Sequence, residues 1–231
     1  MRALTPEILD FLAPDDPRAM RSRRDLARIN AVMRQSAIMA KALIACPPPK
    51  KLADLGGGDG CFMLEVAKRL AKHWPGVQLS ILDRQSIVSA QTQAGFAALG
   101  WRCETLQGDI FETLPRIEPD IVTANLFLHH LDDAALRRLL ALVASRSRAF
   151  IACEPRRSAF ALLGARLVFA LGANGVTRHD AVASVRGGFR DLELSMLWPK
   201  DRAWICQEHG VFPFSQVFWA QARSGGPKNA L

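Results

Sequence analysis

The amino-acid sequence predicts an α/β protein built on a doubly wound, mainly parallel sheet. From Lys51 onward, short apolar runs alternate with longer runs of helical periodicity, which is typical of parallel strands joined by crossover helices. The first of these runs, residues 51–55, leads directly into a glycine-rich turn, and residues 52–62 across the two read LADLGGGDGCF. The chain has 231 residues and 49% hydrophobic content, which suffices for one sizeable core. We therefore expect a single sheet with helices on both faces.

The first 46 residues are expected to form a helical cap that leads into this core. A short helix begins at Thr5 and Pro6, and Asp16 followed by Pro17 begins a longer one, since each pair supplies a capping side chain and a proline suited to the first turn. The longer helix is expected to run to about Cys46, where a proline cluster ends it. Its expected buried stripe is Leu26, Ile29, Met33 and Ala37.

The core domain is expected to occupy residues 47–223, with strands and helices in alternation. The expected strands cover residues 51–55, 77–82, 101–106, 120–126, 149–154, 191–197 and 214–221. The expected helices cover residues 60–72, 86–99 and 133–146.

An almost wholly apolar segment at residues 158–175 interrupts this alternation. It predicts a helix inside a lid-like insertion at residues 156–188, and it is shorter than the ~20 residues that a membrane span needs. A buried core helix, a lid over an apolar substrate and a surface that touches a membrane all stay open for it. Residues 224–231 are expected to form a disordered tail.

The glycine-rich turn discriminates between two classes of cofactor. Such a turn after the first strand is the cofactor site of doubly wound folds, because missing side chains let the backbone approach the ligand. A dinucleotide fingerprint G-x-G-x-x-G fails here, because Cys61 stands at the third glycine position. The pattern D-x-G-x-G-x-G is satisfied instead, by Asp54, Gly56, Gly58 and Gly60. This pattern resembles the first motif of class I S-adenosylmethionine-dependent methyltransferases.

Three later segments carry the same resemblance. The second predicted strand ends in Asp83, where a carboxylate can accept the ribose hydroxyls, and Asp109 with Ile110 resembles the family's adenine site. The segment DIVTANLFLHHLDD at residues 120–133 resembles its fourth motif. The cofactor-binding residues that the resemblance implies are Asp54, Gly56, Gly57, Gly58, Gly60, Asp83, Arg84, Asp109, Ile110 and Asn125.

The resemblance extends over residues 50–155 and implies more than the site. It implies a Rossmann-like seven-stranded sheet of order 3-2-1-4-5-7-6 with an antiparallel last strand, and S-adenosylmethionine as cofactor with S-adenosylhomocysteine as product. Taken singly, Asp83 has an alternative role as a helix N-cap, and Asp109 as a turn residue.

Two histidines after the fourth predicted strand, His129 and His130, are the candidate catalytic bases. A side chain with a pKa near ~6.5 is suited to removing a proton from a phenol or carboxylic acid at neutral pH. We favour His129, and a structural hydrogen bond near Asp132 is the alternative for either ring.

Three further residues are candidates for binding the substrate: Phe127, Arg156 and His179. Arg156 has a solvated or ion-paired role as its alternative, and His179 a place in a surface turn.

Missing motifs narrow the acceptor. Asn125 is followed by Leu126 and Phe127, whereas enzymes of this fold that methylate the amines of nucleic-acid bases carry a Pro-Pro-aromatic loop there, and the paired-glutamate loop of arginine methyltransferases is also missing. We expect a small apolar acceptor of phenolic, quinone or polyketide-like character, methylated on oxygen. The alternatives are a C-methyltransferase of a quinone precursor and, outside this class, an NAD(P)-dependent oxidoreductase.

Charge and cysteine content bear on partners and location. The formal net charge is +8, with the excess in the N-terminal helix, and a solvated helix face is favoured there over nucleic-acid binding. Five cysteines without CxxC spacing predict no metal site and a reducing compartment, and with no signal peptide we expect a cytoplasmic protein. Monomer and homodimer both stay open, as does peripheral membrane contact.

Overall fold

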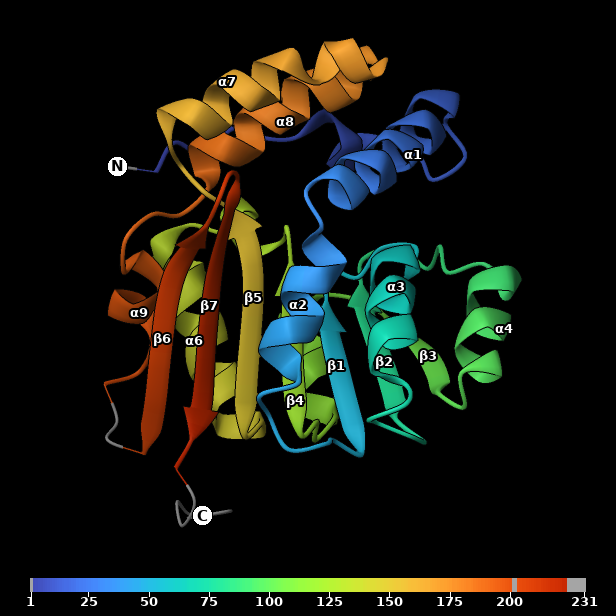
Figure 1. Ribbon diagram of the computed structural model, residues 1–231, viewed down its shortest axis with the longest axis vertical. Helices are drawn as coiled ribbons and strands as arrows, with labels where there is room; N and C mark the ends of the chain where they lie inside the picture. The colour runs from blue at the N-terminus through green and yellow to red at the C-terminus, as the bar shows by residue number, and fades with distance from the viewer. Residues whose placement is uncertain (1, 201–202, 224–231) are drawn as a thin grey trace.

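A computed structural model describes residues 2–200 and 203–223 of the chain. Its centre is a seven-stranded sheet of order β3-β2-β1-β4-β5-β7-β6 (Figure 1). Strand β7 runs antiparallel to both β5 and β6, and the other pairs are parallel. These findings confirm the predicted fold class, strand order and antiparallel last strand. The strands are β1 (Lys51–Leu55), β2 (Gln78–Asp83), β3 (Arg102–Gln107), β4 (Ile121–Asn125), β5 (Ala149–Pro155), β6 (Trp204–Val211) and β7 (Ser215–Ala222).

Helices cover both faces of this sheet. The longer helices are α1 (Pro17–Val32), α2 (Gln35–Leu43), α3 (Cys61–Leu70), α4 (Ala90–Ala98), α6 (Asp133–Arg146), α7 (Ala159–Leu167) and α8 (Gly175–Gly187). The short ones are α5 (Ile110–Thr113), α9 (Glu193–Leu197) and the 3-10 turns η1 (Ile8–Phe11), η2 (Leu114–Arg116), η3 (Leu128–His130) and η4 (Val168–Leu171).

Two hydrophobic cores lie on opposite faces of the sheet. Strand β5 is buried along its whole length, as expected of a strand that is covered on both sides. One core includes Met39 of α2 and Met63 of α3, and the other includes Leu140 of α6 and Leu194 of α9. In Figure 1, α2 and α3 lie in front of the sheet and α6 lies behind it.

A helical layer crosses the carboxyl ends of the central strands. Figure 1 shows α7, α8 and α1 together above this edge, with β5 pointing toward them. Helix α8 contacts α1, α7, η1 and η3. The layer therefore covers the edge of the sheet at which ligands bind in open α/β folds.

The N-terminal region differs from its prediction. The single long helix is two helices, because Arg34 adopts a left-handed conformation with φ of 55° between them. Helix α2 packs on the sheet, and α1 turns away to contact α8, so the expected apolar stripe is divided between the two helices and is only half-buried. The buried residues of α1 are Ala19, Ser22 and Asp25, and the Asp25 carboxylate accepts from the Asn174 backbone N–H at 2.9 Å. Hydrophobic periodicity could not indicate a buried polar face.

The first turn of this region also begins later than expected. The sequence predicts a helix from Thr5, whereas η1 begins at Ile8. Its first two backbone N–H groups donate to the Asp180 carboxylate of α8, at 2.8 and 3.0 Å, so a distant residue sets where the turn begins.

The expected strand at residues 191–197 is wrong, because most of this segment forms helix α9. The Glu208 carboxylate of β6 accepts from the backbone N–H groups of Leu194 and Ser195, at 3.2 and 2.7 Å, and so satisfies the start of the helix. The sixth strand lies further along the chain, at β6.

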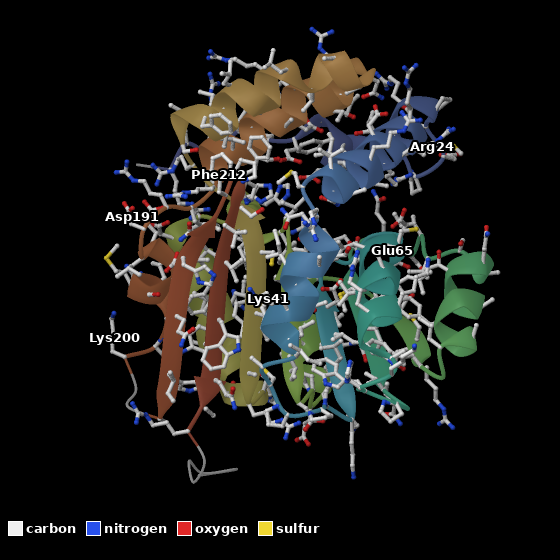
Figure 2. The ribbon with its side chains drawn as sticks, in the orientation of Figure 1. Arg24, Lys41, Glu65, Asp191, Lys200 and Phe212 are labelled. Atoms are coloured by element: carbon white, nitrogen blue, oxygen red, sulfur yellow. The ribbon has the colours of Figure 1, made fainter. Side chains whose placement is uncertain are left out.

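The apolar segment forms a helix that is shorter than expected. Gly172, with φ of 75°, follows η4, and a second helix, α8, begins at Gly175. One face of α7 is exposed: Phe160 is 52% and Leu163 is 53% exposed, so α7 is not a fully buried core helix. Figure 2 shows Phe212 at the β6–β7 turn beneath α7, and its ring lies 5.5 Å from that of Phe160.

No helix among the described residues is both long and apolar enough to cross a membrane. The domain boundaries drawn from the sequence stay predictions, although α2 lies inside the expected cap and yet packs on the sheet. The expected disordered tail, residues 224–231, lies outside the described residues.

Candidate active site

The turn after β1 has a backbone that requires glycine. Gly56, Gly58 and Gly60 have φ of 65°, 56° and 73°, a left-handed region that residues with a Cβ rarely adopt. Gly57 has a different reason to lack a side chain, because a Cβ there would lie 2.7 Å from Oδ2 of Asp54. The turn therefore presents backbone, without side chains, above the end of β1.

Asp54 lies beneath this turn and is almost fully buried. It is 2% exposed, and its Oδ1 accepts from the Thr123 hydroxyl at 2.7 Å. Burial, with a contribution from the charge of Asp83, raises the pKa of Asp54 to about 7. A cationic group of a ligand, placed beside Asp54, would favour the ionised form of this carboxyl.

Asp83 ends the neighbouring strand and holds the glycine turn in place. Its Oδ2 accepts from the Gly58 backbone N–H at 2.9 Å, and its Oδ1 accepts from that of Gln85 at 2.8 Å. Because β1 and β2 are adjacent and parallel, this carboxylate and the turn meet at one edge of the sheet. The structure thus brings the glycine turn and Asp83 into contact, which the sequence indicated only through the resemblance to a known family.

The residues after β3 lie further along the same edge. Asp109 caps the short helix α5, its Oδ1 accepting from the Phe111 backbone N–H at 2.8 Å, and Ile110 is buried. Arg84 is mostly exposed and lies 3.6 Å from the Asp109 carboxylate, so the two predicted cofactor residues pair with each other.

Asn125, at the end of β4, has a buried side-chain oxygen, Oδ1, that lacks a hydrogen-bond donor among the described residues. A buried acceptor without a donor is costly, so a bound group with an N–H or O–H would stabilise it. Together with the glycine turn, the buried Asp54 and the strand-end Asp83, this atom fits the amino and ribose groups of S-adenosylmethionine.

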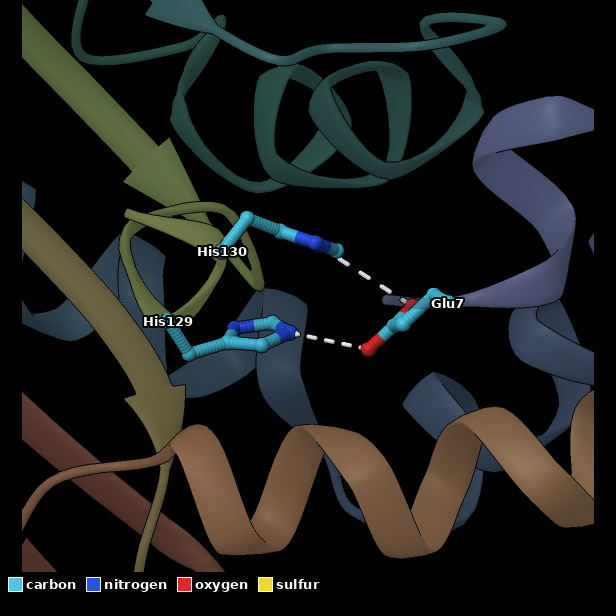
Figure 3. A group of neighbouring side chains, drawn as sticks. All are labelled: Glu7, His129 and His130. Atoms are coloured by element: carbon cyan, nitrogen blue, oxygen red, sulfur yellow. Dashed lines mark hydrogen bonds and ion pairs between the residues drawn. The ribbon is translucent and has the colours of Figure 1, made fainter. Parts of the chain in front are cut away.

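His129 lies at the next strand end and is held by two carboxylates. It is 4% exposed, its Nδ1 lies 2.8 Å from Oε2 of Glu154, and its Nε2 lies 3.2 Å from Oε1 of Glu7 (Figure 3). The Glu154 side chain is fully buried, and its other oxygen accepts from the backbone N–H groups of Phe127 and Leu128, at 3.0 and 2.9 Å. Glu154 therefore fixes both the backbone and the ring of η3.

The protonation state of His129 follows from these contacts. Burial acts to lower the pKa of its ring, but the hydrogen bonds and charges of Glu154 and Glu7 outweigh burial and raise that pKa to about 9. With Glu7 in place, His129 is an imidazolium at neutral pH.

His130 follows on the more exposed side of the same turn. Its Nδ1 lies 3.3 Å from Oδ2 of Asp10, its Nε2 lies 4.0 Å from Oε2 of Glu7, and its side chain is 25% exposed. The two imidazole rings are tilted neighbours, with centroids 4.2 Å apart. Glu7 therefore contacts both rings from the same side, as Figure 3 shows.

The N-terminal segment that carries Glu7 is tied to the core by several contacts. The guanidinium of Arg2 donates to the backbone oxygens of Gly187 and Leu131, at 2.9 and 2.8 Å, and lies over the ring of Phe189. The Ser184 hydroxyl of α8 donates to the Glu7 carboxylate. This segment covers His129 from the side of the helical layer.

The sequence-based interpretation missed Arg2, Glu7 and Glu154 as site residues. Glu154 did carry a signal, because it is a carboxylate at the end of the otherwise apolar run AFIACEP, and a buried charge in such a strand needs a partner. Arg2 and Glu7 carried no comparable signal, since their partners are more than 100 residues away in the chain.

The three predicted substrate-binding residues lie in different places. Phe127 packs against Gly56, at the junction between the glycine turn and η3. The guanidinium of Arg156 lies against Gly210 of β6, two strands beyond β5. His179 is on the outer side of α8, 44% exposed and 2.8 Å from Asp180. Of the three, only Phe127 adjoins both the glycine turn and the turn that carries His129.

Comparison with known proteins identifies relatives. Over 93 residues, the chain is 33% identical to a mitomycin biosynthesis 6-O-methyltransferase from Streptomyces lavendulae, a match covering 40% of this chain and 25% of that protein. An O-methyltransferase family protein from Burkholderia thailandensis has a similar structure, with a TM-score of 0.62 and 18% identity over 91% of this chain and 61% of that one. The chain thus spans a quarter to about three fifths of the length of these two proteins.

A third relative is close to this chain in length. The plantazolicin methyltransferase BamL, crystallised with a triazolic substrate analog and SAH, has a TM-score of 0.62 and 14% identity over 90% of this chain and 92% of its own. At such identities, the structural matches support the fold alone.

The decisive comparison is with the family model. The model of the O-methyltransferase domain matches residues 10–150, well over half of the chain. This match confirms the predicted resemblance and includes the glycine turn, the strand-end carboxylates and both histidines. The chain therefore belongs to the O-methyltransferase domain family.

Proposed function

We propose that this protein methylates an oxygen atom of a small, apolar aromatic acceptor, with His129 as the base. The observation that carries the proposal is the buried pair formed by His129, which follows β4, and Glu154, which lies near the end of β5. Glu154 fixes the orientation of the ring through Nδ1 and directs Nε2 away from the core. A positioned imidazole of this kind is the usual arrangement for general-base chemistry.

The cofactor residues are those at the other strand ends. Asp54, Asp83 and Asn125 supply the polar groups, and the glycine turn supplies space for the backbone to approach the ligand. When bound, S-adenosylmethionine supplies an electrophilic methyl group. The protein chiefly has to align the acceptor oxygen with that group and remove its proton.

Proton removal requires a change at Glu7. With Glu7 at Nε2, His129 is protonated and cannot accept a proton. If the acceptor hydroxyl replaces Glu7 at this nitrogen, one of the two supporting carboxylates is lost and the pKa of His129 falls toward neutrality. After releasing its own proton to solvent, the neutral imidazole nitrogen would take the hydroxyl proton while the acceptor oxygen bonds to the methyl carbon and the methyl–sulfur bond breaks, with S-adenosylhomocysteine as the leaving group. Glu154 would stabilise the imidazolium that results.

Several observations support a small aromatic acceptor over the alternatives. The relative from Streptomyces lavendulae is named for an O-methylation in mitomycin biosynthesis, and the family is one of O-methyltransferases. Half-buried Phe127 offers an aromatic face next to the glycine turn. The family match favours methylation on oxygen over methylation on carbon, and a methyltransferase over a nicotinamide-dependent oxidoreductase.

The experiment that tests this function is a screen of phenolic, hydroxyquinone and polyketide-like acceptors with S-adenosylmethionine, read by mass spectrometry for the gain of one methyl group. We expect His129→Gln to lower kcat by about 100-fold or more for an accepted phenol, because general-base catalysis contributes ~10²–10⁴-fold. Binding of S-adenosylhomocysteine should change little. The matched control is His73→Gln, a substitution of an exposed histidine at the end of the α3 region. Equal kcat values for the two variants would contradict the assignment of the base.

Cofactor binding is tested separately by calorimetry. Asp83→Ala removes the carboxylate that orders Gly58, and we expect it to weaken S-adenosylhomocysteine binding at least about 10-fold. Binding of NADH by the wild-type protein in place of S-adenosylhomocysteine would overturn the proposal.

A further inference from the structure

The two histidines of η3 are oriented in the same way by separate carboxylates. Nδ1 of His129 lies 2.8 Å from Glu154, and Nδ1 of His130 lies 3.3 Å from Asp10. In both rings, the carboxylate takes Nδ1 and leaves Nε2 to face the opposite direction. Metal-binding histidines in proteins are held in this way by outer carboxylates, which fix the ring and make the free nitrogen a better ligand.

The Nε2 atoms of both rings converge on one carboxylate. Nε2 of His129 is 3.2 Å from Oε1 of Glu7, and Nε2 of His130 is 4.0 Å from Oε2 of the same residue. One ligand atom from each of the three residues lies within 4.8 Å of the others. Figure 3 shows the two rings and the carboxylate facing a common centre.

We propose that Glu7, His129 and His130 bind one divalent transition-metal ion, of which zinc is the best match. Two imidazole nitrogens and a carboxylate oxygen form a ligand set suited to Zn²⁺, Co²⁺ or Ni²⁺. Two atoms that each lie ~2.0–2.1 Å from one ion are at most about 4 Å apart, so the three side chains need only a small inward adjustment.

Charge and access favour the same site. Three carboxylates, from Glu7, Asp10 and Glu154, surround two imidazoles, and a divalent ion would compensate part of that negative charge. The guanidinium of Arg2 is nearby but donates to backbone oxygens, so it leaves the Glu7 carboxylate available. His130 is a quarter exposed, which provides an entry path for an ion from solvent.

The consequence for activity rests on the proposed function. A metal ion on Nε2 of His129 displaces the proton of that nitrogen to solvent and takes the electron pair that would accept the acceptor proton. It also holds Glu7, and with it the N-terminal segment, in the position that the acceptor hydroxyl must replace. The bound ion therefore locks the site in a closed, inactive arrangement and makes methyl transfer reversibly sensitive to zinc.

Metal binding is tested first and without any acceptor. The full chain, free of a histidine tag and stripped with a chelator, is titrated with ZnCl₂ by calorimetry, and with Co²⁺ to record the absorption of the bound ion. We expect one ion per chain. The Co²⁺ spectrum should lack thiolate charge-transfer absorption, which excludes binding at the exposed Cys61 and Cys206.

Variants separate this site from incidental binding. His130→Gln removes a ligand but keeps the proposed base, and it should weaken zinc binding by more than about 100-fold. Asp10→Asn alters only the outer carboxylate and should weaken binding by about 10–100-fold. His73→Gln, at an exposed histidine outside the cluster, should bind as the wild type does. Thermal unfolding in chelator shows that each variant is folded, and unchanged affinity in a folded His130→Gln would overturn the proposal.

Activity gives a second, independent readout. Zinc should inhibit methyl transfer by the wild type, a chelator should restore it, and His130→Gln should be insensitive to the same zinc concentration. If zinc binds at this cluster without inhibiting, the metal site stands and the role of His129 as base fails. If zinc inhibits but binding survives in both Glu7→Gln and His130→Gln, the ion lies elsewhere and the metal site fails.

Discussion

The proposed cofactor end of the site, which is the glycine turn with Asp54 and Asp83, and the proposed acceptor end, which is η3 with Glu7 and Glu154, are built from different kinds of contact. At the cofactor end, carboxylates at strand ends bind backbone N–H groups of neighbouring turns, as Asp83 does with Gly58 and Gln85. At the acceptor end, side chains join segments that are more than 100 residues apart, as Glu7 does with His129 and Asp180 with Ile8. The first end is held by the sheet itself, and the second by a segment that lies across it.

This difference separates binding from chemistry. The glycine turn and the strand-end carboxylates have their positions set by adjacent parallel strands, so the proposed cofactor site has its arrangement without a ligand. The proposed base, His129, is covered by the N-terminal segment and is protonated while Glu7 contacts it. Changes at the cofactor end should therefore alter affinity, and changes at the acceptor end should alter turnover, pH dependence and the stability of the covering segment.

The largest effect is expected from Glu154→Ala at the acceptor end. This change leaves the buried ring of His129 and two backbone N–H groups without their acceptor, so we expect a loss of about 3–5 kcal/mol in the free energy of unfolding. Urea denaturation measures it. Glu65→Ala removes an exposed carboxylate that pairs with Lys68, and it should cost no more than about 0.5 kcal/mol. Similar values for the two variants would mean that Glu154 does not organise this end.

The next effect is a pH dependence that belongs to the acceptor end. The pKa of His129 is about 9 in the folded protein and ~6.5 when unfolded, so folding is favoured by up to about 3 kcal/mol below pH ~6.5. This contribution is lost as the pH rises through about 9. Denaturation of the wild type from pH 6 to 9.5 should show this loss of stability. His129→Gln should lack it, so the difference in unfolding free energy between the two proteins should shrink as the pH rises. His73→Gln should keep the wild-type slope, and a flat wild-type profile would contradict the double carboxylate contact.

The smallest effect is expected from alanine substitutions at two glycines, of which one lies at the cofactor end. Gly58 and Gly76 have φ of 56° and 70°, and a Cβ at either position would meet no atom within 4 Å. Alanine at each should cost about 1–2 kcal/mol of stability from backbone strain alone. Only Gly58→Ala should also weaken binding of S-adenosylhomocysteine in calorimetry, because only Gly58 lies in the turn above Asp54. Equal cofactor affinity for the two variants would place the ligand away from this turn.

The fold could be predicted where the hydrophobic periodicity is strong. The prediction failed where a tertiary contact overrides that periodicity. Strands β1, β2, β4 and β5 contain apolar runs and β3 is more polar, but all five follow one another through helices, so their positions were readable within one or two residues. The segment at residues 191–197 reads equally well as a strand, and it becomes helical because Glu208 of β6 satisfies its first N–H groups. The break at Arg34 also has no local signal, since neither glycine nor proline stands there.

The sequence by itself determined the cofactor end: the glycines that a left-handed turn requires, and the carboxylates that parallel strands carry to one edge. These are local properties, because a strand, its turn and the following helix are contiguous in the chain. Only the tertiary structure decided the acceptor end, where Glu154 orients His129 and Glu7 reaches it from 122 residues away. The physical reason is that the partners of a buried charge are selected by packing of distant segments, which neither spacing nor composition of the chain encodes.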